Sequence, residues 1–299
     1  MTTATANRTY EIHEVAELTG LATARLRAWE RRYEVVRPRR QPNRYRAYTI
    51  EQVALLRAFS RLCAAGERIG DLVKEARESV ISRAEGRATD GSPLAQLVAA
   101  AKRLEKDRLS LLLAEQRRRM DMSAFGRDIV MPFGEVIGDL WALGKLSVAV
   151  EHLASEVIVQ QLKTDLANGP TNGPVLLAAC LSGEHHEWGF LVTLTQLQAR
   201  GWRVHYLGAD LPTKDIVEAT WTVIPRVVAL SAADPVNVTL RLPELRRLPR
   251  LLPPGTTVVL GGQGAEVNGA KLRRAGLKVG AENIPEPQSE PAARLAGRS

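Results

Sequence analysis

The segment Glu184-x-His186-x-x-Gly189 carries side chains that could bind a cofactor. The imidazole of His186 can coordinate a metal ion, and the carboxylate of Glu184 can hold the second ring nitrogen and so fix the tautomer. Gly189 has no side chain and would let a flat group approach the following helix closely. The spacing therefore predicts a metal-ligating histidine beside a planar cofactor.

Loops of small residues recur further along the chain, each directly after an apolar run. They are Gly208-Ala209-Asp210, Ser231-Ala232-Ala233 and Gly261-Gly262-Gln263-Gly264. In an open parallel sheet, ligands bind outside the carboxyl ends of the strands. We therefore expect a groove for the same ligand, lined by Gly208, Asp210, Ser231, Gly261 and Gly262.

Trp141 and the pair Glu151-His152 precede this region, on segments with helical periodicity. Adjacent side chains on a helix diverge by about 100°, and buried polar groups need partners, which favours a pocket for Glu151 and His152. Spacing alone leaves other interpretations open. Trp141 could be a core residue, His186 could be structural, and an adventitious zinc site could form from Glu184, His185, His186 and Glu187.

The elements that would position these residues can be predicted from hydrophobic periodicity. From residue 173 to 282, short apolar runs alternate with amphipathic helical stretches, which predicts an α/β domain with a doubly wound, Rossmann-like parallel sheet. The expected strands are 175–180, 204–207, 227–230, 258–260 and 277–279. Residues 94–168 predict about four helices, enough for a small bundle.

The boundaries follow from composition, and the chain is expected to be multidomain. Residues 81–93 are rich in Gly, Ser, Thr and charged residues and are expected to be a linker. Residues 283–299 have little to bury and are expected to be a disordered tail.

The first 80 residues carry a concentrated positive charge. Nine arginines lie between Arg25 and Arg46, against two acids, Glu30 and Glu34. A helix from Thr23 to Tyr33, followed by a short hairpin, predicts a winged helix-turn-helix that binds DNA, although a solvated basic face would look similar. The expected DNA-binding residues are Arg25, Arg27, Trp29, Arg31, Arg32, Arg39, Arg40, Arg44 and Arg46.

Composition excludes several classes of protein. Hydrophobic residues make up 45% of the chain and charged residues 25%, and no apolar run approaches the roughly 18 residues of a membrane span. No secretory signal is recognised at Met1-Thr2-Thr3, so we expect a cytoplasmic protein without a membrane partner. Cys63 and Cys180 lie far apart in apolar contexts, which argues against a disulfide framework.

The motifs together resemble a known group of regulators. Thr9 to about Val73, with Leu26-Arg27-Ala28-Trp29-Glu30-Arg31-Arg32-Tyr33, resembles the winged-helix DNA-binding domain of the MerR family. The remainder resembles the helical and Rossmann-like module that binds cobalamin, through Trp141-x9-Glu151-His152 and Glu184-x-His186-x-x-Gly189 with Gly261-Gly262. The combination is similar to the CarH and LitR group of light-responsive repressors, up to about Gly280.

This resemblance implies a cofactor and a mechanism. Cobalamin, as adenosylcobalamin, would have His186 as its lower cobalt ligand and its tail in the groove lined by Ser231 and Gly261-Gly262. Trp141, Glu151 and His152 would surround the upper ligand. No catalytic turnover is expected: light or cofactor state would change a homo-oligomer, a dimer or tetramer, and with it the affinity for operator DNA.

Three positions depart from the group's pattern. Ala142 stands where light-responsive members have a histidine that can bind cobalt after photolysis, Glu34 stands where glycine is usual, and Tyr45 where histidine is common. Other interpretations therefore stay open: a bilin or haem in the same pocket, a vestigial pocket whose output depends on a protein partner, or a cobalamin-dependent methyl carrier. The arginines argue against the last. Residues 71–82 are too short for a dimerising coiled coil, so oligomerisation is predicted to involve the cofactor-binding domains.

Overall fold

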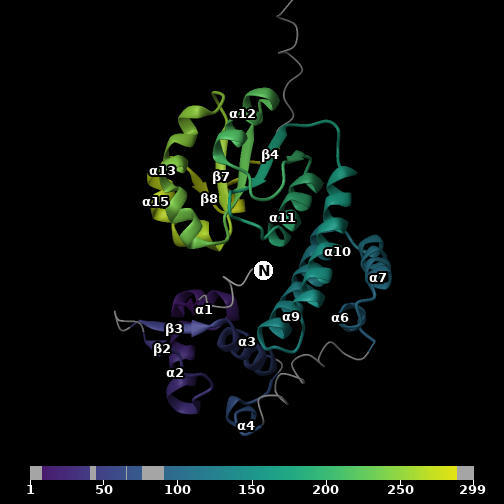
Figure 1. Ribbon diagram of the computed structural model, residues 1–299, viewed down its shortest axis with the longest axis vertical. Helices are drawn as coiled ribbons and strands as arrows, with labels where there is room; N and C mark the ends of the chain where they lie inside the picture. Colours follow the sequence, from purple (N-terminus) through teal and green to yellow (C-terminus); the bar gives the residue numbers. More distant parts are fainter. Residues whose placement is uncertain (1–8, 41–44, 65, 76–90, 288–299) are drawn as a thin grey trace, which may run out of the picture. The chain divides into compact units, whose positions relative to one another are not determined.

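The computed structural model describes residues 9–40, 45–64, 66–75 and 91–287, and the chain forms two compact units (Figure 1). The first comprises Met1–Arg119 and Arg127–Val157, and the second comprises Met120–Gly126 and Ile158–Ser299. The predicted linker lies almost wholly outside the described residues, as does the tail from residue 288.

The first unit begins with a winged helix-turn-helix, as predicted. Its elements are β1 (Thr9–Tyr10), α1 (Ile12–Thr19), α2 (Thr23–Tyr33), β2 (Arg39–Arg40), β3 (Arg46–Thr49), α3 (Ile50–Ala64) and α4 (Ile69–Leu72). The antiparallel sheet has the order β1-β3-β2, and strand β1 was not foreseen.

Local chemistry explains the turn between α1 and α2. Glu11 and Glu14 form a reciprocal capping box at the start of α1, and Gly20 ends that helix with φ +66°. Leu26 and Trp29 of α2 are buried in a core that includes Val15, Tyr48 and Phe59. The helix thus keeps one apolar face inward and leaves its other faces to arginines.

Four longer helices lie where the periodicity predicts helix. They are α6 (Pro93–Lys102), α7 (Lys106–Arg119), α9 (Met131–Ala142) and α10 (Val148–Ala167), with α8 (Met122–Phe125) and the π-helical segment η1 (Gly126–Val130) between α7 and α9. The predicted separate four-helix bundle is not confirmed. The chain's contacts group α6, α7, α9 and α10 as far as Val157 with the DNA-binding domain, and α8 and the rest of α10 with the sheet.

The second unit contains the predicted parallel sheet. Its strands are β4 (Val175–Cys180), β5 (Arg203–Tyr206), β6 (Val227–Ser231), β7 (Thr257–Gly261) and β8 (Lys278–Val279), in the order β5-β4-β6-β7-β8. The helices are α11 (Trp188–Ala199), α12 (Thr213–Val223), α13 (Pro235–Leu251), α14 (Gln263–Val267) and α15 (Gly269–Arg274). Strand order reverses between β4 and β6, so a ligand is expected at the loops that follow those two strands.

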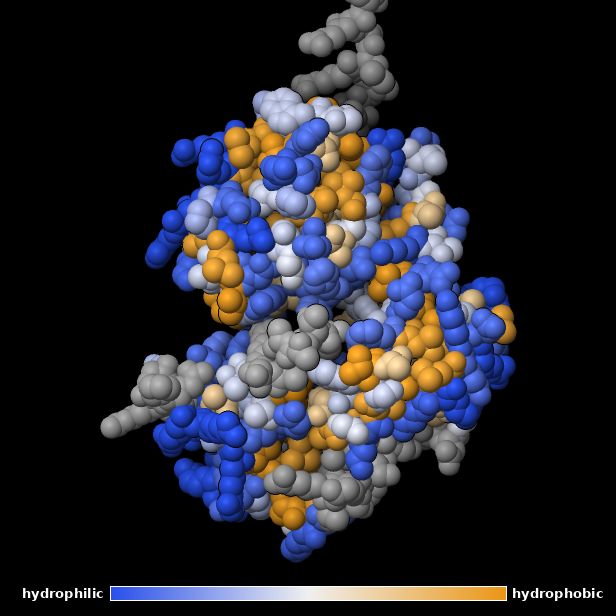
Figure 2. Space-filling model, in the orientation of Figure 1, coloured by the Kyte–Doolittle hydropathy of each residue, from blue (hydrophilic) through white to orange (hydrophobic). Residues whose placement is uncertain are grey.

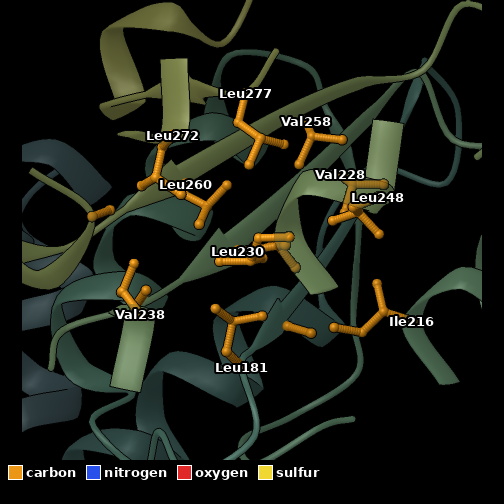
Figure 3. Packing of buried hydrophobic residues seen from close by; sticks show 14 of the residues in the cluster. Leu181, Ile216, Val228, Leu230, Val238, Leu248, Val258, Leu260, Leu272 and Leu277 are labelled. Carbon is orange, nitrogen blue, oxygen red and sulfur yellow. The ribbon is translucent and has the colours of Figure 1, made fainter. Parts of the chain in front are cut away.

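Helices cover both faces of this sheet (Figure 1). On one face, α12, α13 and α15 pack over alternate strand residues, and Figure 3 shows Val228, Leu230 and Leu260 at the centre of that core. Helix α11 lies on the opposite face (Figure 1). Burial on both faces explains why the strands read as continuous apolar runs.

Packing extends past the predicted start of the tail at residue 283. Ile284 is buried, and the amide of Asn283 donates to the Val279 carbonyl at 2.8 Å. Within the described part of the chain, no helix is both long and apolar enough to cross a membrane.

Candidate cofactor site and basic surface

His186 is held by the carboxylate of Glu184. The Nδ1 atom of His186 lies 2.6 Å from Oε1 of Glu184, whose side chain is 1% exposed, whereas the His186 side chain is 53% exposed. A ring that donates from Nδ1 keeps its lone pair on Nε2, the atom that would ligate a metal. The geometry therefore leaves the imidazole accessible, with Nδ1 engaged by Glu184 and Nε2 not occupied by Glu184.

Glu184 also joins two loops across the switch point of the sheet. Its Oε2 accepts backbone hydrogen bonds from Ala233 at 2.6 Å and Asp234 at 3.2 Å, in the loop after β6. Burial acts to raise the pKa of Glu184, but the hydrogen bonds from His186 and Ala233 outweigh it and hold the pKa below its usual value. The carboxylate thus stays ionised, as the tautomer argument requires.

Asp210 ties the loop after β5 to the same place. Its Oδ1 accepts from the backbone amide of Gly183 at 2.6 Å, and its own amide donates to the Glu184 carbonyl at 3.1 Å. The hydrogen bond from Gly183 is the main reason that the pKa of Asp210 lies below its usual value. Three of the four loops predicted from the sequence therefore converge, with Gly208 at φ +106° in the turn before Asp210.

The glycines of these loops have two different roles. A Cβ atom at Gly262 would lie 2.8 Å from the Ala232 carbonyl oxygen, at a φ of +99°, so the backbone itself requires glycine. Around Gly189 and Gly261, a Cβ atom would have no heavy atom within 4 Å, so these two leave open surface. Ser231, at the end of β6, is buried at 5% exposure.

Sequence reasoning missed two supporting residues, Asn237 and Arg241, and named Gly264 only as part of a loop. A Cβ atom at Gly264 would lie 2.7 Å from the Ala232 carbonyl oxygen, which locks the loop after β7 against the loop after β6. The side chains of Asn237 and Arg241 donate to the Ser182 carbonyl at 2.9 and 2.8 Å. Only the glycine-rich stretch around Gly264 gave a signal in the sequence, since nothing local links α13 to the loop after β4.

The adventitious zinc site considered from the sequence is not supported. Among the described residues, no group of three His, Cys, Asp or Glu side chains could hold a metal ion. Glu187 instead accepts from the hydroxyl of Tyr206 at 2.6 Å and pairs with Lys163 at 3.0 Å.

Trp141, Glu151 and His152 lie in the first unit. Trp141 is half-buried near the end of α9, and its neighbours Asp139 and Ala142 in the same helix are buried. Glu151 is buried and accepts from Ser155 Oγ at 3.0 Å, while Nδ1 of the exposed His152 lies 2.6 Å from its Oε2. The two adjacent side chains therefore contact each other, and Glu151 has Ser155 as a second partner.

The predicted DNA-binding arginines are mostly exposed, and Figure 2 shows a hydrophilic surface over α2 and β2. Six of them are exposed and enter no ion pair with another described residue: Arg25, Arg27, Arg31, Arg32, Arg39 and Arg40. Arg44 lies outside the described residues.

Arg46 and Trp29 are placed differently from the other predicted contacts. The Nε of Arg46 donates to Glu30 at 2.7 Å, and Glu30 also accepts from the Tyr48 hydroxyl, so the strand β3 is tied to α2. Burial and the bond to Glu30 raise the pKa of Tyr48. Trp29 is 6% exposed and packs edge-on against Phe59, so it positions α2 rather than offering a surface to DNA.

Three protein-family models match this chain, and together they cover the site residues described above. Residues 10–78 match the model described as MerR HTH family regulatory protein, and residues 93–163 and 174–284 match two models described as B12 binding domain.

Three curated proteins are similar over most of their length. The HTH-type transcriptional repressor CarH of Myxococcus xanthus is 33% identical over 92% of this chain and 95% of its own. The repressor CarA of the same organism is 36% identical over 86% of this chain and 88% of its own. Dimethylamine corrinoid protein 1 of Methanosarcina acetivorans is 26% identical over 67% of this chain and 94% of its own.

Proposed function

Since the chain belongs to the family of the HTH-type transcriptional repressors CarH and CarA, we propose that it is a repressor whose binding to operator DNA depends on a bound cobalamin. The observation that carries this proposal is the order of one MerR-type match and two B12-binding matches along nearly the whole of this chain.

The residues of the second unit fit a cobalamin. His186 would be the lower cobalt ligand through Nε2, because Glu184 occupies Nδ1 and the ring is half exposed. Gly189 and Gly261 would face the flat macrocycle, and Gly208, Asp210, Ser231 and Gly262 would line the groove for the tail. When bound, cobalamin supplies a cobalt centre with an exchangeable ligand, which we propose to be adenosyl. Trp141, Glu151 and His152 stay predicted contacts of that ligand.

Repression requires contact with DNA, which we assign to α2 and the wing. Arginine is suited to phosphate oxygens because its planar guanidinium can donate two hydrogen bonds at once. Arg25, Arg27, Arg31 and Arg32 on α2, with Arg39 and Arg40 on β2, supply this surface, and the pair between Glu30 and Arg46 holds the wing against the helix.

The first test is cobalamin binding by His186→Ala, with His185→Ala as the matched control. We expect wild type and His185→Ala to retain adenosylcobalamin through desalting with the same visible spectrum, because His185 is the exposed neighbour that Glu184 does not hold. His186→Ala should bind more weakly with a changed spectrum. An unchanged spectrum in His186→Ala would contradict the ligand assignment.

Light is proposed as the signal. Ala142 limits which ligand can bind cobalt after illumination. Position 142 has no imidazole, so the illuminated state cannot gain an upper histidine ligand there. We expect green light to change the spectrum of the adenosylcobalamin complex and to reduce its mass in size-exclusion chromatography with light scattering. A constant mass before and after illumination would reduce the proposal to a light-independent cobalamin sensor.

The alternatives considered from the sequence receive less support. Both models matched by the cofactor-binding part are B12-binding domains, which gives no support to a bilin or haem. A methyl carrier is disfavoured because the corrinoid protein accounts for less of the chain than the repressors do, and residues 10–78 match a DNA-binding family.

A further inference from the structure

The second unit carries a basic surface on the side of the sheet opposite the cofactor loops. Helix α13 ends before β7, and α15 ends before β8, so the ends of both helices lie at the amino edge of the parallel sheet. The cofactor loops lie at the carboxyl edge, about 16 Å away along a five-residue strand. This surface is therefore separate from the site described above.

Three arginines of this surface line one cavity. The cavity has a volume of about 330 Å³ and is lined by Arg246, Pro249, Arg250, Arg274 and Ala275. Arg246 and Arg250 lie one turn apart on α13, and Arg274 comes from α15, which packs beside α13 (Figure 1). No carboxylate is among the lining residues, so three like charges share one concave site and none of them forms an ion pair with an acid in the described part of the chain.

The charge of the second unit is strongly segregated. From Leu245 to Gly280 the sequence has one acid, Glu266, and seven cations: Arg246, Arg247, Arg250, Lys271, Arg273, Arg274 and Lys278. The other described residues of this unit carry six cations and eleven acids. None of the seven forms an ion pair with another described residue. The unit as a whole is nearly neutral, yet the segment that contributes the three lining arginines is strongly positive.

The helix dipole explains only part of this arrangement. Cations are favoured in the last turn of a helix, which suits Arg250 on α13 and Arg274 on α15. Arg246 lies more than a turn before the end of α13, and like charges four residues apart on a helix repel. A surface that gathers uncompensated arginines into a cavity is typical of one that binds phosphate.

We infer that the surface formed by Arg246, Arg250 and Arg274 is a second contact for the DNA phosphate backbone, used together with α2 and the wing. The inference rests on the proposed function, because it takes operator DNA as the polyanion already bound by the chain. The lining has no aromatic ring on which a base could stack, which disfavours a nucleotide as the ligand. Duplex DNA, with one charge per about 1.7 Å, can occupy two separate surfaces at once.

The test uses the full-length protein and a duplex of about 40 base pairs of arbitrary sequence, since phosphate contacts are independent of sequence. Binding is followed by fluorescence anisotropy from about 50 to 200 mM salt. The variant is Arg246→Gln with Arg250→Gln and Arg274→Gln. The matched control is Arg103→Gln with Arg119→Gln and Arg127→Gln, which removes the same charge from exposed arginines that are ion-paired.

Loss of three phosphate contacts should lower the salt slope by about 2 to 3 and weaken binding roughly tenfold at 100 mM salt. The control should change the slope by less than about one. Equal slopes for the variant and the control would overturn the second contact. A difference that disappears on adding millimolar inorganic phosphate at constant ionic strength would also overturn it, because the cavity would then take free phosphate.

A third variant separates this inference from the proposed function. Arg25→Gln with Arg27→Gln should weaken binding of the same duplex if α2 contacts DNA. Weakening by this variant without an effect of the α13 and α15 substitutions would overturn only the second contact. A wild-type protein that binds no duplex would overturn both.

Discussion

Glu184 is proposed to act on the candidate site through His186. Its two oxygens accept from His186, Ala233 and Asp234, so the same carboxylate orients the imidazole and joins two loops. Positioning groups of this kind commonly change metal affinity by about 10- to 100-fold. We expect Glu184→Gln to weaken cobalamin binding by that amount and to leave His186 as the ligand.

Gly189 allows the cofactor-facing surface to be tested apart from folding. Gly189→Ala meets no atom within 4 Å and lies in α11, so we expect unfolding free energy to stay constant or to rise by up to about 1 kcal/mol. Cobalamin binding, measured by spectral titration, should weaken at least roughly tenfold, because the added methyl group occupies the surface that a flat ligand approaches. Unchanged binding would show that Gly189 does not face the ligand.

Gly262→Ala is the contrasting substitution for the same measurements. Its Cβ atom would lie 2.8 Å from a carbonyl oxygen at a φ of +99°, so we expect a loss of about 2 kcal/mol in unfolding free energy.

The reactivity of the Cys180 thiol tests whether the end of β4, next to the loop of Glu184 and His186, is buried in solution. The thiol is fully buried on β4, and burial raises its pKa to about 11. At pH 8 the thiolate would be only about one part in a thousand, and reactivity should rise with pH until the pKa is passed. With a colorimetric thiol reagent at pH 8, we expect the native protein to react at no more than one thiol, the half-exposed Cys63, and the denatured protein at two. Reaction of two thiols in the native state at similar rates would refute this.

At the scale of elements, α2 is fixed by its contacts on both sides. Leu26 and Trp29 pack into the core, and Glu30 binds Arg46 and Tyr48 of β3. Two core residues and one acid therefore fix the orientation of α2, which leaves its arginine-rich faces exposed. This explains why Arg46 is half-buried while the arginines of α2 are exposed.

The end of α2 contains backbone strain that can be removed. Glu34 is the C-cap residue at φ +49°, a conformation that glycine adopts at lower cost, and glycine is the residue expected there from the MerR resemblance. We expect Glu34→Gly to raise unfolding free energy in urea by about 1 kcal/mol, since its exposed pair with Arg37 contributes little. Ile224→Gly, at the end of α12 with φ +50°, is the equivalent test in the second unit. A loss of stability in both variants would contradict the argument.

At the scale of the molecule, one buried carboxylate joins the DNA-binding domain to the following helices. Oδ1 of Asp139 on α9 lies 2.8 Å from Arg57 of α3, and Oδ2 forms an ion pair with Arg61 at 3.0 Å. Asp139 is 7% exposed and two residues before Trp141. Within the first unit, the helix that carries a candidate cofactor residue is thus also in contact with the DNA-binding domain.

Removing this carboxylate should destabilise the first unit. We expect Asp139→Ala to lower unfolding free energy by about 2 kcal/mol, less than for a fully buried pair because both arginines are partly exposed. Glu135→Ala, which removes the more exposed partner of Arg61, should cost less than about 1 kcal/mol. Chemical denaturation measures both. Equal costs would show that burial at Asp139 contributes nothing.

The pH dependence of the same group has a definite sign. Burial raises the pKa of Asp139 above its usual value, although Arg57 and Arg61 lower it. The proton-dependent part of its contribution to stability is therefore fully present below the unfolded pKa of about 3.9 and falls as the pH rises through the folded pKa, while the ion pairs with Arg57 and Arg61 offset part of that loss. The variant Asp139→Asn should lose that part of the pH dependence, and a profile identical to wild type would contradict the assignment.

The sequence alone determined the elements and the local chemistry. Apolar runs bounded by Gly and Pro gave the five strands to within one or two residues, because strands buried on both faces must be apolar throughout. The spacing of Glu184 and His186 gave the imidazole and its partner, because the two lie in one short loop, with Gly189 at the start of the helix that follows. The helix of residues 23–33 was equally local, with a core face at Leu26 and Trp29.

Only the tertiary structure decided which distant groups meet. Glu184 binds Ala233 and Asp234, Arg46 binds Glu30, and Asp139 binds Arg57. The helices between residues 93 and 167 divide between two units, so the predicted bundle is not confirmed. Periodicity reports which face of an element is buried, but not what is packed against that face. Pairings between residues far apart in the chain depend on how whole elements pack, which no local pattern contains.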